Sequence, residues 1–272
     1  MPAGLQLTFV ADSETWRNQR ERRYQLDRDQ ARDMLEVLAR ELPAVTYTEG
    51  SRRTLVVTTY LDSPARDYRR MVEESDGNAS LKVRVREYLP ILDATGEIVP
   101  STSCHLERKE RVGELRHKQR VKLPKRSLGA ILRRAASVRG SADVAGALEA
   151  ELDRYQLEPV LVSIYERSVF GSDRGGLRVT FDERLRFHAP PDGLYDAHRA
   201  LTPDVLGQAM APGPPRILEL KDAAGTASPA WLERMLTDVP DMSGYSKFRD
   251  GMATLDAGHS LGLELTRSVF AG

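Results

Sequence analysis

Residues 81 to 89, LKVRVREYL, alternate between apolar and charged side chains, and no other feature constrains the fold of this chain as strongly. Successive side chains of a β-strand point to opposite faces, so Lys82, Arg84 and Arg86 share one face of a strand. The other face carries leucine and valine, with Glu87 standing out by its polarity. Three like charges on one face repel one another, so the fold has to place a counter-charge or water beside them.

The same basic bias recurs in other strand-like segments. One wet face explains a single strand of this kind, because antiparallel sheets commonly have one solvated side. Six or more strands with the same bias favour a different arrangement. In 176–187 the alternation places Arg178, Asp182, Arg184 and Arg186 on the charged face. The predicted strands are 20–27, 52–62, 81–89, 103–112, 114–123, 159–171, 176–187 and 215–222.

Helix signals lie between these strands only near the two ends and in the middle of the chain. Asp27 and Gln30 form a capping box that predicts a helix through Glu41. Ser63 and Pro64 predict the start of a short helix ending near Glu74. Further helices are predicted over 127–155, with a break at Gly140 and a new N-cap at Ser141, over 228–239, with Ser228 as N-cap, and over 246–258, while 188–214 reads as a loop. Strands that follow one another in sequence indicate an α+β fold with antiparallel pairing.

A closed antiparallel β-barrel reconciles these observations. Its charged faces point into a wet lumen that forms a tunnel, and its apolar faces point outward and are covered by helices. Buried cations without a partner are unfavourable, so such a lumen requires a compensating anion. Arginine matches phosphate oxygens with a planar fork, and lysine adds point charges. A chain of linked phosphates therefore fits the tunnel.

Composition limits the other classes of function. The 272 residues carry 40 Lys and Arg and 40 Asp and Glu, so no overall attraction to nucleic acid or membrane is implied. Aromatic residues are not interleaved with the basic ones, as single-strand binders prefer, so nucleic acid is not expected as a partner. The single cysteine, Cys104, suits a reducing compartment, and neither a signal peptide nor an apolar run of about 18 residues is present. These features predict a cytoplasmic protein.

With these segments in view, the sequence resembles the VTC (vacuolar transporter chaperone) polyphosphate polymerase domain, of the triphosphate tunnel metalloenzyme (CYTH-like) superfamily. No single motif is specific, whereas the ordered set is, and it extends from about Glu21 to Leu255. Residues 1–18 are expected to form a tail or a loosely attached first segment, followed by the domain at 19–258 and a second tail at 259–272. The motifs are Arg23-Tyr24, Tyr60-Leu61-Asp62, the alternating Lys82, Arg84 and Arg86, Glu107-Arg108-Lys109, the basic Lys118, Arg120 and Lys122, Tyr165-Glu166-Arg167, Arg178 to Asp182, Glu219-Leu220-Lys221, Pro229-Ala230-Trp231 and Ser246-Lys247-Phe248.

The resemblance implies transfer of the γ-phosphate of ATP to a growing polyphosphate chain inside the tunnel. ATP and polyphosphate would be the ligands, and Glu219 would hold Mn²⁺ or Mg²⁺. A salt bridge from Glu219 to Lys221 or an arginine is the structural alternative. The implied catalytic residues are Arg84, Arg86, Lys109, Arg167 and Lys247, and the implied substrate-binding residues are Arg23, Lys82, Lys118, Arg120, Lys122, Arg178, Lys221 and Ser246.

Two departures keep other activities open. The stretch before Ser246 has Gly244 and Tyr245 where the family often has a further lysine, which weakens one substrate contact. The triphosphatase branch opens with Glu-x-Glu-x-Lys, which is absent here, so a metal-dependent triphosphatase is a weaker alternative. A non-catalytic polyphosphate or nucleotide binder is the third. The sequence shows no membrane span and leaves a membrane partner and the oligomeric state open.

Some individual roles also remain open at this point. Asp182 is either a second metal contact or a residue that orients Arg178 or Arg184, and the second role is favoured. Tyr60 and Tyr88 are expected to pack in the core in preference to stacking on an adenine. Replacing Arg84 or Arg86 by alanine is expected to leave the fold intact, to relieve repulsion and to weaken triphosphate binding.

Overall fold

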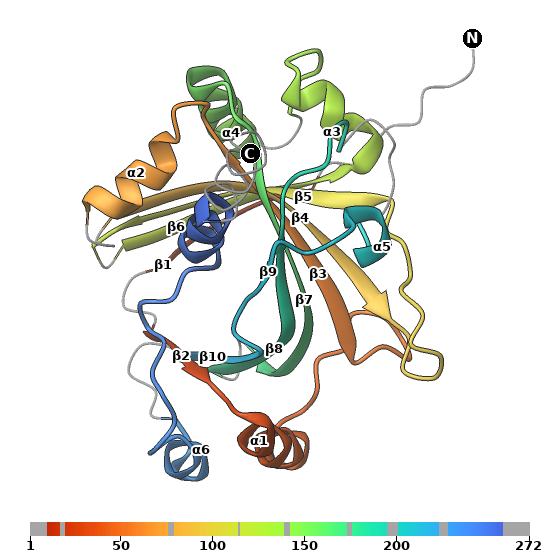
Figure 1. Ribbon diagram of the computed structural model, residues 1–272, viewed down its shortest axis with the longest axis vertical. Coiled ribbons are helices and arrows are strands. Elements are labelled where there is room, and N and C mark those ends of the chain that lie inside the picture. Colours follow the sequence, from red (N-terminus) through yellow and green to blue (C-terminus); the bar gives the residue numbers. More distant parts are fainter. Residues whose placement is uncertain are drawn as a thin grey trace, which may run out of the picture.

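The computed structural model describes residues 10–16, 20–75, 79–113, 115–138, 142–172, 176–194, 201–222 and 228–257, and its fold is built around one curled antiparallel sheet (Figure 1). The strand order is β1-β6-β5-β4-β3-β7-β8-β10-β2, and the short β9 pairs with β8. The strands are β1 (Val10–Trp16), β2 (Arg20–Gln25), β3 (Arg53–Asp62), β4 (Ala79–Ile91), β5 (Ser103–Val112), β6 (Leu115–Pro124), β7 (Glu158–Ser172), β8 (Leu177–His188), β9 (Ala211–Pro212) and β10 (Arg216–Asp222).

Most of the helices pack on the outer side of the sheet, as the alternation predicted. The helices are α1 (Arg28–Glu41), α2 (Asp67–Glu74), α3 (Lys125–Leu132), α4 (Ala142–Tyr155), α5 (Pro203–Leu206) and α6 (Ala230–Met235), and a last helix spans 247–257. The α+β class and the antiparallel pairing are confirmed.

The sheet is a half-barrel, and the expected closure of its ladder is not found. Among the described residues, the edge strands β1 and β2 do not pair with each other. The segment before the last helix instead forms backbone hydrogen bonds with the free edge of β2. Gln25 N–H donates to the Pro240 carbonyl at 3.1 Å, and Met242 N–H donates to the Arg23 carbonyl at 2.7 Å. A side-chain ion pair links β2 to β6, the strand next to the other edge, because Arg116 Nη1 of β6 lies 2.8 Å from Glu21 Oε2 of β2.

Residues opposite each other in an antiparallel ladder share a face, and the register confirms the alternation on β4. Lys82 lies opposite Lys109, and Lys109 lies opposite Lys118, so the cations of three strands share the concave face. Glu87 lies on the convex face, where it is 1% exposed. Its carboxylate accepts a 2.6 Å hydrogen bond from Lys125 Nζ at the start of α3, which explains an acidic residue among apolar neighbours.

Three apolar clusters join the convex face to the helices. Val83, Leu106 and Val121 of β4 to β6 pack with α2, α3 and α4. The outer faces of β8 and β10 pack with α1 and α6. Leu55 and Ile164, on β3 and β7, belong to a third cluster with Leu201 and Leu206. Cys104 is fully buried among the first group, as expected for a strand residue.

The last helix lies on the opposite, concave side of the sheet. Phe248 packs on Tyr60 of β3 with ring centroids 5.2 Å apart. Gly251 comes so close to Leu161 and Phe187 that a Cβ at this position would lie 2.6 Å from Leu161 Cδ2. The chain after β10 therefore turns back and covers part of the inner face (Figure 1). The predicted core role of Tyr60 fits this packing.

Helix starts follow the predicted signals only in part. The capping box of Asp27 and Gln30 is present in both directions. The helix expected from Ser63 begins at Asp67 instead, because Arg66 has a left-handed φ of 61°. The Asp62 carboxylate accepts the backbone N–H groups of Ser63, Tyr68 and Arg69, so β3 supplies the cap.

Other expectations are also revised at the ends of elements. Ser228 was expected as an N-cap, but Pro229 takes that position and Ser228 Oγ donates to Asp222 Oδ1 at 3.0 Å. Val10–Trp16 pairs with β6, although residues 1–18 were expected as a tail. The loop expected over 188–214 contains α5 and β9. The predicted break at Gly140 and the cap at Ser141 lie outside the described residues.

A bulge removes two arginines from the predicted charged face. The β7–β8 register shifts between Ile164 and Glu166, and Arg184 has a φ of 56°. Arg184 and Arg186 are exposed as a result. Arg184 Nη1 binds Glu166 Oε1 at 2.7 Å, while Glu166 also binds Arg53, so this group is separate from the concave face.

Candidate phosphate-binding cavity

A cavity of about 470 Å³ lies on the concave face of the half-barrel. Among the described residues, eleven Lys and Arg side chains and two carboxylates line it. They come from β2, β4, β5, β6, β7 and β10 and from the start of the last helix. The charged side chains point into the cavity because alternate residues of each strand face the concave side of the sheet.

The cavity brings together most of the residues that the sequence singled out. Three come from β4 and two from β10. Two more come from the Ser-Lys-Phe segment, which follows β4 by more than 150 residues in the chain. The predicted residues in its lining are Arg23, Lys82, Arg84, Arg86, Lys109, Arg167, Glu219, Lys221, Ser246 and Lys247.

Four predicted substrate-binding residues do not line the cavity. Lys118 and Arg120 lie on β6 at positions paired with Glu14 and Asp12 of β1, and Lys122 is exposed. Arg178 donates from Nη2 to the Tyr47 hydroxyl at 3.0 Å.

Several lining residues were not assigned to the site from the sequence. Glu21, Arg111 and Arg116 continue the period of two from Arg23, Lys109 and Lys118, so that period was a usable signal for them. Tyr165 lies two positions before Arg167 and belongs to the same motif, whereas Arg249 had no such signal. Tyr245 also lines the cavity, and its buried hydroxyl has no hydrogen-bond partner within the described part of the chain.

Glu219 is held between two cations of the cavity wall. Its Oε2 accepts from Arg23 Nε at 3.0 Å, and its Oε1 lies 3.5 Å from Lys221 Nζ. Burial opposes the charge of Glu219, but the cations around it, Arg23 foremost, hold its pKa well below its usual value. The salt bridge considered as an alternative is therefore present, and it keeps the carboxylate ionised.

Glu107 gives a second cation its orientation. It is fully buried, and Arg84 Nε lies 2.7 Å from its Oε2. Burial alone would raise the pKa of Glu107, but Arg84, Arg86 and Lys118 outweigh it and lower that pKa strongly. The part of the Arg84 guanidinium that does not contact Glu107 is therefore left to bind an anion in the cavity.

Asp182 contacts neither of the arginines expected from the sequence. Arg178 reaches Tyr47 and Arg184 lies outside beyond the bulge. Asp182 binds Arg167 and Lys247 instead, at 2.6 to 2.8 Å.

A family model for the VTC domain matches residues 18–256 of the chain. The chain belongs to the VTC domain family. The match runs from the start of β2 to the end of the last helix, so it includes every predicted residue that lines the cavity.

Solved structures share only a loose likeness with this VTC domain. The PH1819 protein of Pyrococcus horikoshii OT3 is 15% identical, with 85% of this chain and 96% of that chain covered and a TM-score of 0.41. A conserved hypothetical protein of Pyrococcus furiosus is 12% identical, with 82% and 94% covered and a TM-score of 0.36. Likeness at this level bears on neither activity nor mechanism. No curated protein matches the chain.

Two lysines of the VTC cavity, Lys82 and Lys109, are poorly compensated. Burial, followed by the charges of Lys109, Arg84, Arg23 and Arg249, lowers the pKa of Lys82 to about 7. Lys82 Nζ donates to Ser246 Oγ at 2.9 Å. Burial and the neighbouring Lys221 and Arg84 likewise lower the pKa of Lys109. An incoming anion would therefore raise the pKa of both amines.

The carboxylates fit a divalent ion shared with phosphates better than an all-protein metal site. Among the described residues, no group of three or more His, Cys, Asp and Glu side chains could hold a metal. Glu219 and Glu21 both line the cavity and both contact Arg23. Magnesium is often bound through one or two carboxylates with substrate phosphates completing its shell, and this donor set fits that pattern.

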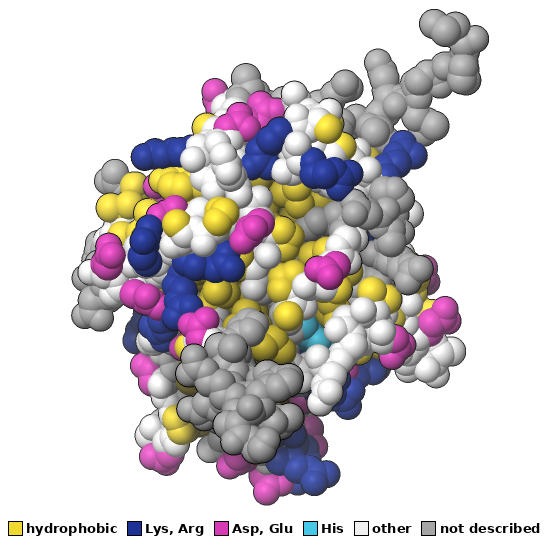
Figure 2. All heavy atoms as spheres, turned by 45° about the horizontal axis from the view of Figure 1, so that its top comes forward, with side chains coloured by type: hydrophobic (Ala, Val, Ile, Leu, Met, Phe, Trp, Pro, Cys, Tyr) yellow, Lys and Arg dark blue, Asp and Glu magenta, His cyan; other side chains and the backbone are white. Residues whose placement is uncertain are grey.

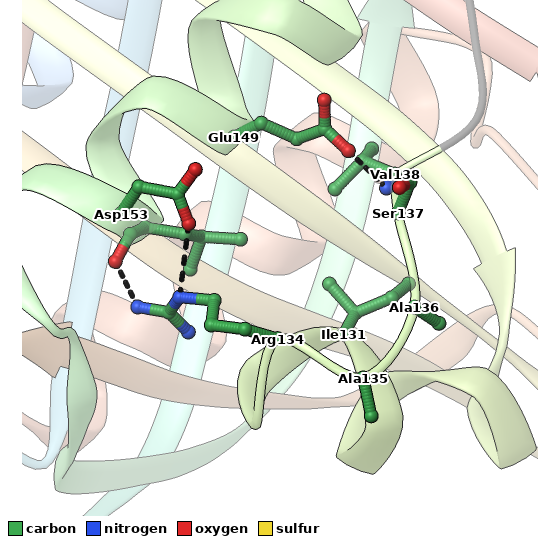
Figure 3. Close-up of a pocket in the computed structure, with 9 residues that line it drawn as sticks. Ile131, Arg134, Ala135, Ala136, Ser137, Val138, Glu149 and Asp153 are labelled. Carbon is green, nitrogen blue, oxygen red and sulfur yellow. Dashed lines mark hydrogen bonds and ion pairs between the residues drawn. The ribbon is translucent and has the colours of Figure 1, made fainter.

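A second hollow of about 290 Å³ lies between the end of α3 and α4 (Figure 3). Its charged groups contact the protein itself. Arg134 donates to the Leu152 carbonyl and pairs with Asp153, and Glu149 accepts the Val138 N–H at 2.8 Å. It has none of the cation excess of the concave face.

The face shown in Figure 2 also lacks that excess. On the face shown in Figure 2, dark blue and magenta side chains are intermixed around a hydrophobic centre. Among the described residues, no helix has the length and hydropathy needed to cross a membrane.

Proposed function

We propose that this VTC domain is a polyphosphate polymerase that transfers the γ-phosphate of ATP to the end of a polyphosphate chain. The observation that supports it is the lining of the concave cavity, where eleven Lys and Arg side chains and two carboxylates come together among the described residues. A polyanion matches such an excess of buried positive charge, and arginine and lysine are the side chains that bind phosphate oxygens.

The proposed reaction needs positioning and charge neutralisation more than it needs a protein nucleophile. A terminal oxygen of the acceptor chain attacks the γ-phosphorus of ATP, the bond between that phosphorus and the β,γ-bridging oxygen breaks, and ADP leaves. The attacking oxygen is already anionic, so no general base is required. Arg84, Arg167 and Lys247 would hold the equatorial oxygens, where charge is spread in the transition state.

Glu219 is the proposed residue for Mn²⁺ or Mg²⁺, with Glu21 as a further candidate. Such an ion, when bound, supplies charge neutralisation across neighbouring phosphate oxygens. Arg23 and Lys221 would keep Glu219 ionised and oriented for this role.

A metal-dependent triphosphatase is the second candidate, and Glu21 is the observation that favours it. A second carboxylate in the lining could help to orient an attacking water. Glu21 is engaged by Arg116 at 2.8 Å and by Arg23, which leaves it less available for that task than a free carboxylate. A non-catalytic binder of polyphosphate or nucleotide is the third candidate.

Incubation of the purified protein with ATP and MnCl₂, followed by gel detection of polyphosphate and an assay for free phosphate, separates these functions. We expect long chains from the wild type and none from Glu219→Gln or Lys247→Met. Glu166→Gln is the matched control, because its pair with Arg53 and Arg184 lies outside the cavity.

Free phosphate without chains would indicate a triphosphatase. Bound triphosphate without any product would indicate a binder. Chains of equal yield from Glu219→Gln and Lys247→Met would overturn the proposed roles of these two residues.

A further inference from the structure

Asp182 lies behind the cavity wall and is 1% exposed. It is in β8, directly opposite Arg167 of β7. Lys247, at the start of the last helix, reaches the same carboxylate from 65 residues further along the chain. Arg167 and Lys247 line the cavity, whereas Asp182 is not part of the lining.

Both oxygens of Asp182 accept hydrogen bonds from these two cations. Arg167 donates from Nε to Oδ1 at 2.6 Å and from Nη2 to Oδ2 at 2.7 Å. Lys247 Nζ donates to Oδ2 at 2.8 Å. The bidentate contact uses one edge of the guanidinium and fixes its plane, and these bonds leave Nη1 for another acceptor.

An aromatic ring supports the same two cations. The Arg167 guanidinium lies 5.2 Å and Lys247 Nζ lies 4.6 Å from the centre of the Tyr165 ring. Cations within about 6 Å of such a ring are attracted by its negative face. Asp182 and Tyr165 therefore hold Arg167 and Lys247 side by side although the two charges repel.

The carboxylate stays ionised in this setting. Burial raises the pKa of Asp182, but Arg167 and Lys247 more than offset that effect and the pKa falls below its ordinary value. Two cations share one anion, so the group keeps a net positive charge toward the cavity.

We propose that Asp182 is a positioning residue that orients Arg167 and Lys247 as one unit toward the phosphate chain. The inference rests on the proposed phosphate chemistry of the cavity, and it adds a residue that does not itself touch the substrate. Arg167 and Lys247 are then expected to act non-additively, because both depend on the same carboxylate.

The sign of the change in triphosphate affinity caused by Asp182→Asn distinguishes a positioning role from a purely electrostatic one. Removing a negative charge beside an anion site should strengthen anion binding if charge alone matters. Loss of orientation should weaken it. We expect Asp182→Asn to weaken inorganic triphosphate binding by roughly tenfold, because charge-assisted hydrogen bonds to both cations are lost.

The test is calorimetric titration of the wild type, Asp182→Asn and Asp182→Glu with inorganic triphosphate, with the folded fraction measured by thermal unfolding. Asp222→Asn is the matched control. Asp222 is also buried, and it pairs with Arg22 Nη2 at 3.0 Å on the helix-covered side of β10. We expect the control to lose stability and to keep its affinity per folded molecule, and Asp182→Glu to recover part of the lost affinity.

A second comparison tests the coupling. In a protein that already carries Arg167→Ala and Lys247→Met, Asp182→Asn should change the residual affinity by less than about twofold. Equal or tighter binding by Asp182→Asn in the otherwise intact protein would overturn the positioning role and leave the proposed function standing. A wild type that does not bind triphosphate at all would overturn the proposed function itself.

Discussion

At the scale of single residues, the cations of the concave face differ in whether a carboxylate or a neutral group binds them. Arg84 is held by the buried Glu107 at 2.7 Å. Lys82, the neighbour two positions before it, donates to the neutral Ser246 hydroxyl and is surrounded by other cations. Relief of repulsion, which the sequence led us to expect at Arg84 or Arg86, therefore applies better to Lys82.

We predict opposite stability changes for two substitutions on β4. Arg84→Ala should lower the free energy of unfolding by about 3 kcal/mol, because it leaves the buried Glu107 carboxylate less compensated. Lys82→Met should raise it by about 1 kcal/mol, because it removes an uncompensated, desolvated amine. Urea unfolding measures both changes, and titration with inorganic triphosphate should show weaker binding by both variants. A gain in stability for Arg84→Ala would contradict this division.

At the scale of elements, the last helix determines where two of the proposed ligands sit. Ser246 and Lys247 lie at its start, and Phe248 and Gly251 fix it on the inner face of the sheet. The helix thus supplies side chains to a cavity whose other walls are strands. A change in its seating should reach the cavity without altering any charged residue.

Gly251→Ala tests this seating. The added Cβ would lie 2.6 Å from Leu161 Cδ2 and 2.8 Å from Phe187 Cδ1, so the helix or these side chains must shift. We expect a loss of about 1 to 2 kcal/mol in stability, from overpacking that exceeds the gain in helix propensity, and weaker triphosphate binding.

The matched control is Gly146→Ala in α4, where no described atom outside the local helix backbone lies within 4 Å of the added Cβ. That change should raise stability by about 1 kcal/mol and leave binding unaltered. Unaltered stability and binding for Gly251→Ala would show that the last helix is not fixed by this contact.

At the scale of the whole molecule, the fold gathers positive charge in the cavity although the sequence as a whole has no net charge. Forty basic and forty acidic residues give a formal net charge of zero, yet the cavity lining is strongly cationic. Many of the carboxylates lie on the outside, where they pair with other surface cations, as Glu166 does with Arg53 and Arg184. Long-range attraction of anions should therefore be weak, and attraction inside the cavity should be strong.

Proton uptake on binding is the measurable consequence. Burial and neighbouring cations lower the folded-state pKa of Lys82 from 10.5 to about 7, so between these values the unfolded chain binds the extra proton. Lys82 therefore contributes stability to the free protein that increases as pH rises from about 7 to 10.5. Bound triphosphate has the opposite effect, because it favours the charged form of the amine. We predict that binding takes up protons at pH 8 and weakens as pH rises from 7 to 9.

Calorimetry at pH 8 in two buffers of different ionisation enthalpy measures this uptake. Lys82→Met, titrated with the same ligand, is the control that cancels protonation changes of the triphosphate itself. Proton release by the wild type relative to Lys82→Met, or an affinity that rises with pH, would contradict the prediction.

Features that depend on local spacing were predictable from the amino-acid sequence alone. The period of two in 81–89 predicts which side chains share a face, because a strand alternates whatever it pairs with. The capping box at Asp27 and Gln30 is a contact between residues three apart, and it formed as expected. The strand pattern and the ordered motifs likewise predicted the α+β class and the VTC family.

Contacts between groups that are distant in sequence depend on the folded arrangement of the chain. The ladder stays open because 240–242 occupies the edge of β2, and this depends on the path of the chain after α6. The bulge at Arg184 moved two arginines outward, since one extra residue reverses the facing of those that follow. The partners of Asp182 come from β7 and from the last helix, so spacing along β8 could not identify them. Alternation assigns a residue to a face, whereas pairing of charges depends on distances in space that only the folded chain defines.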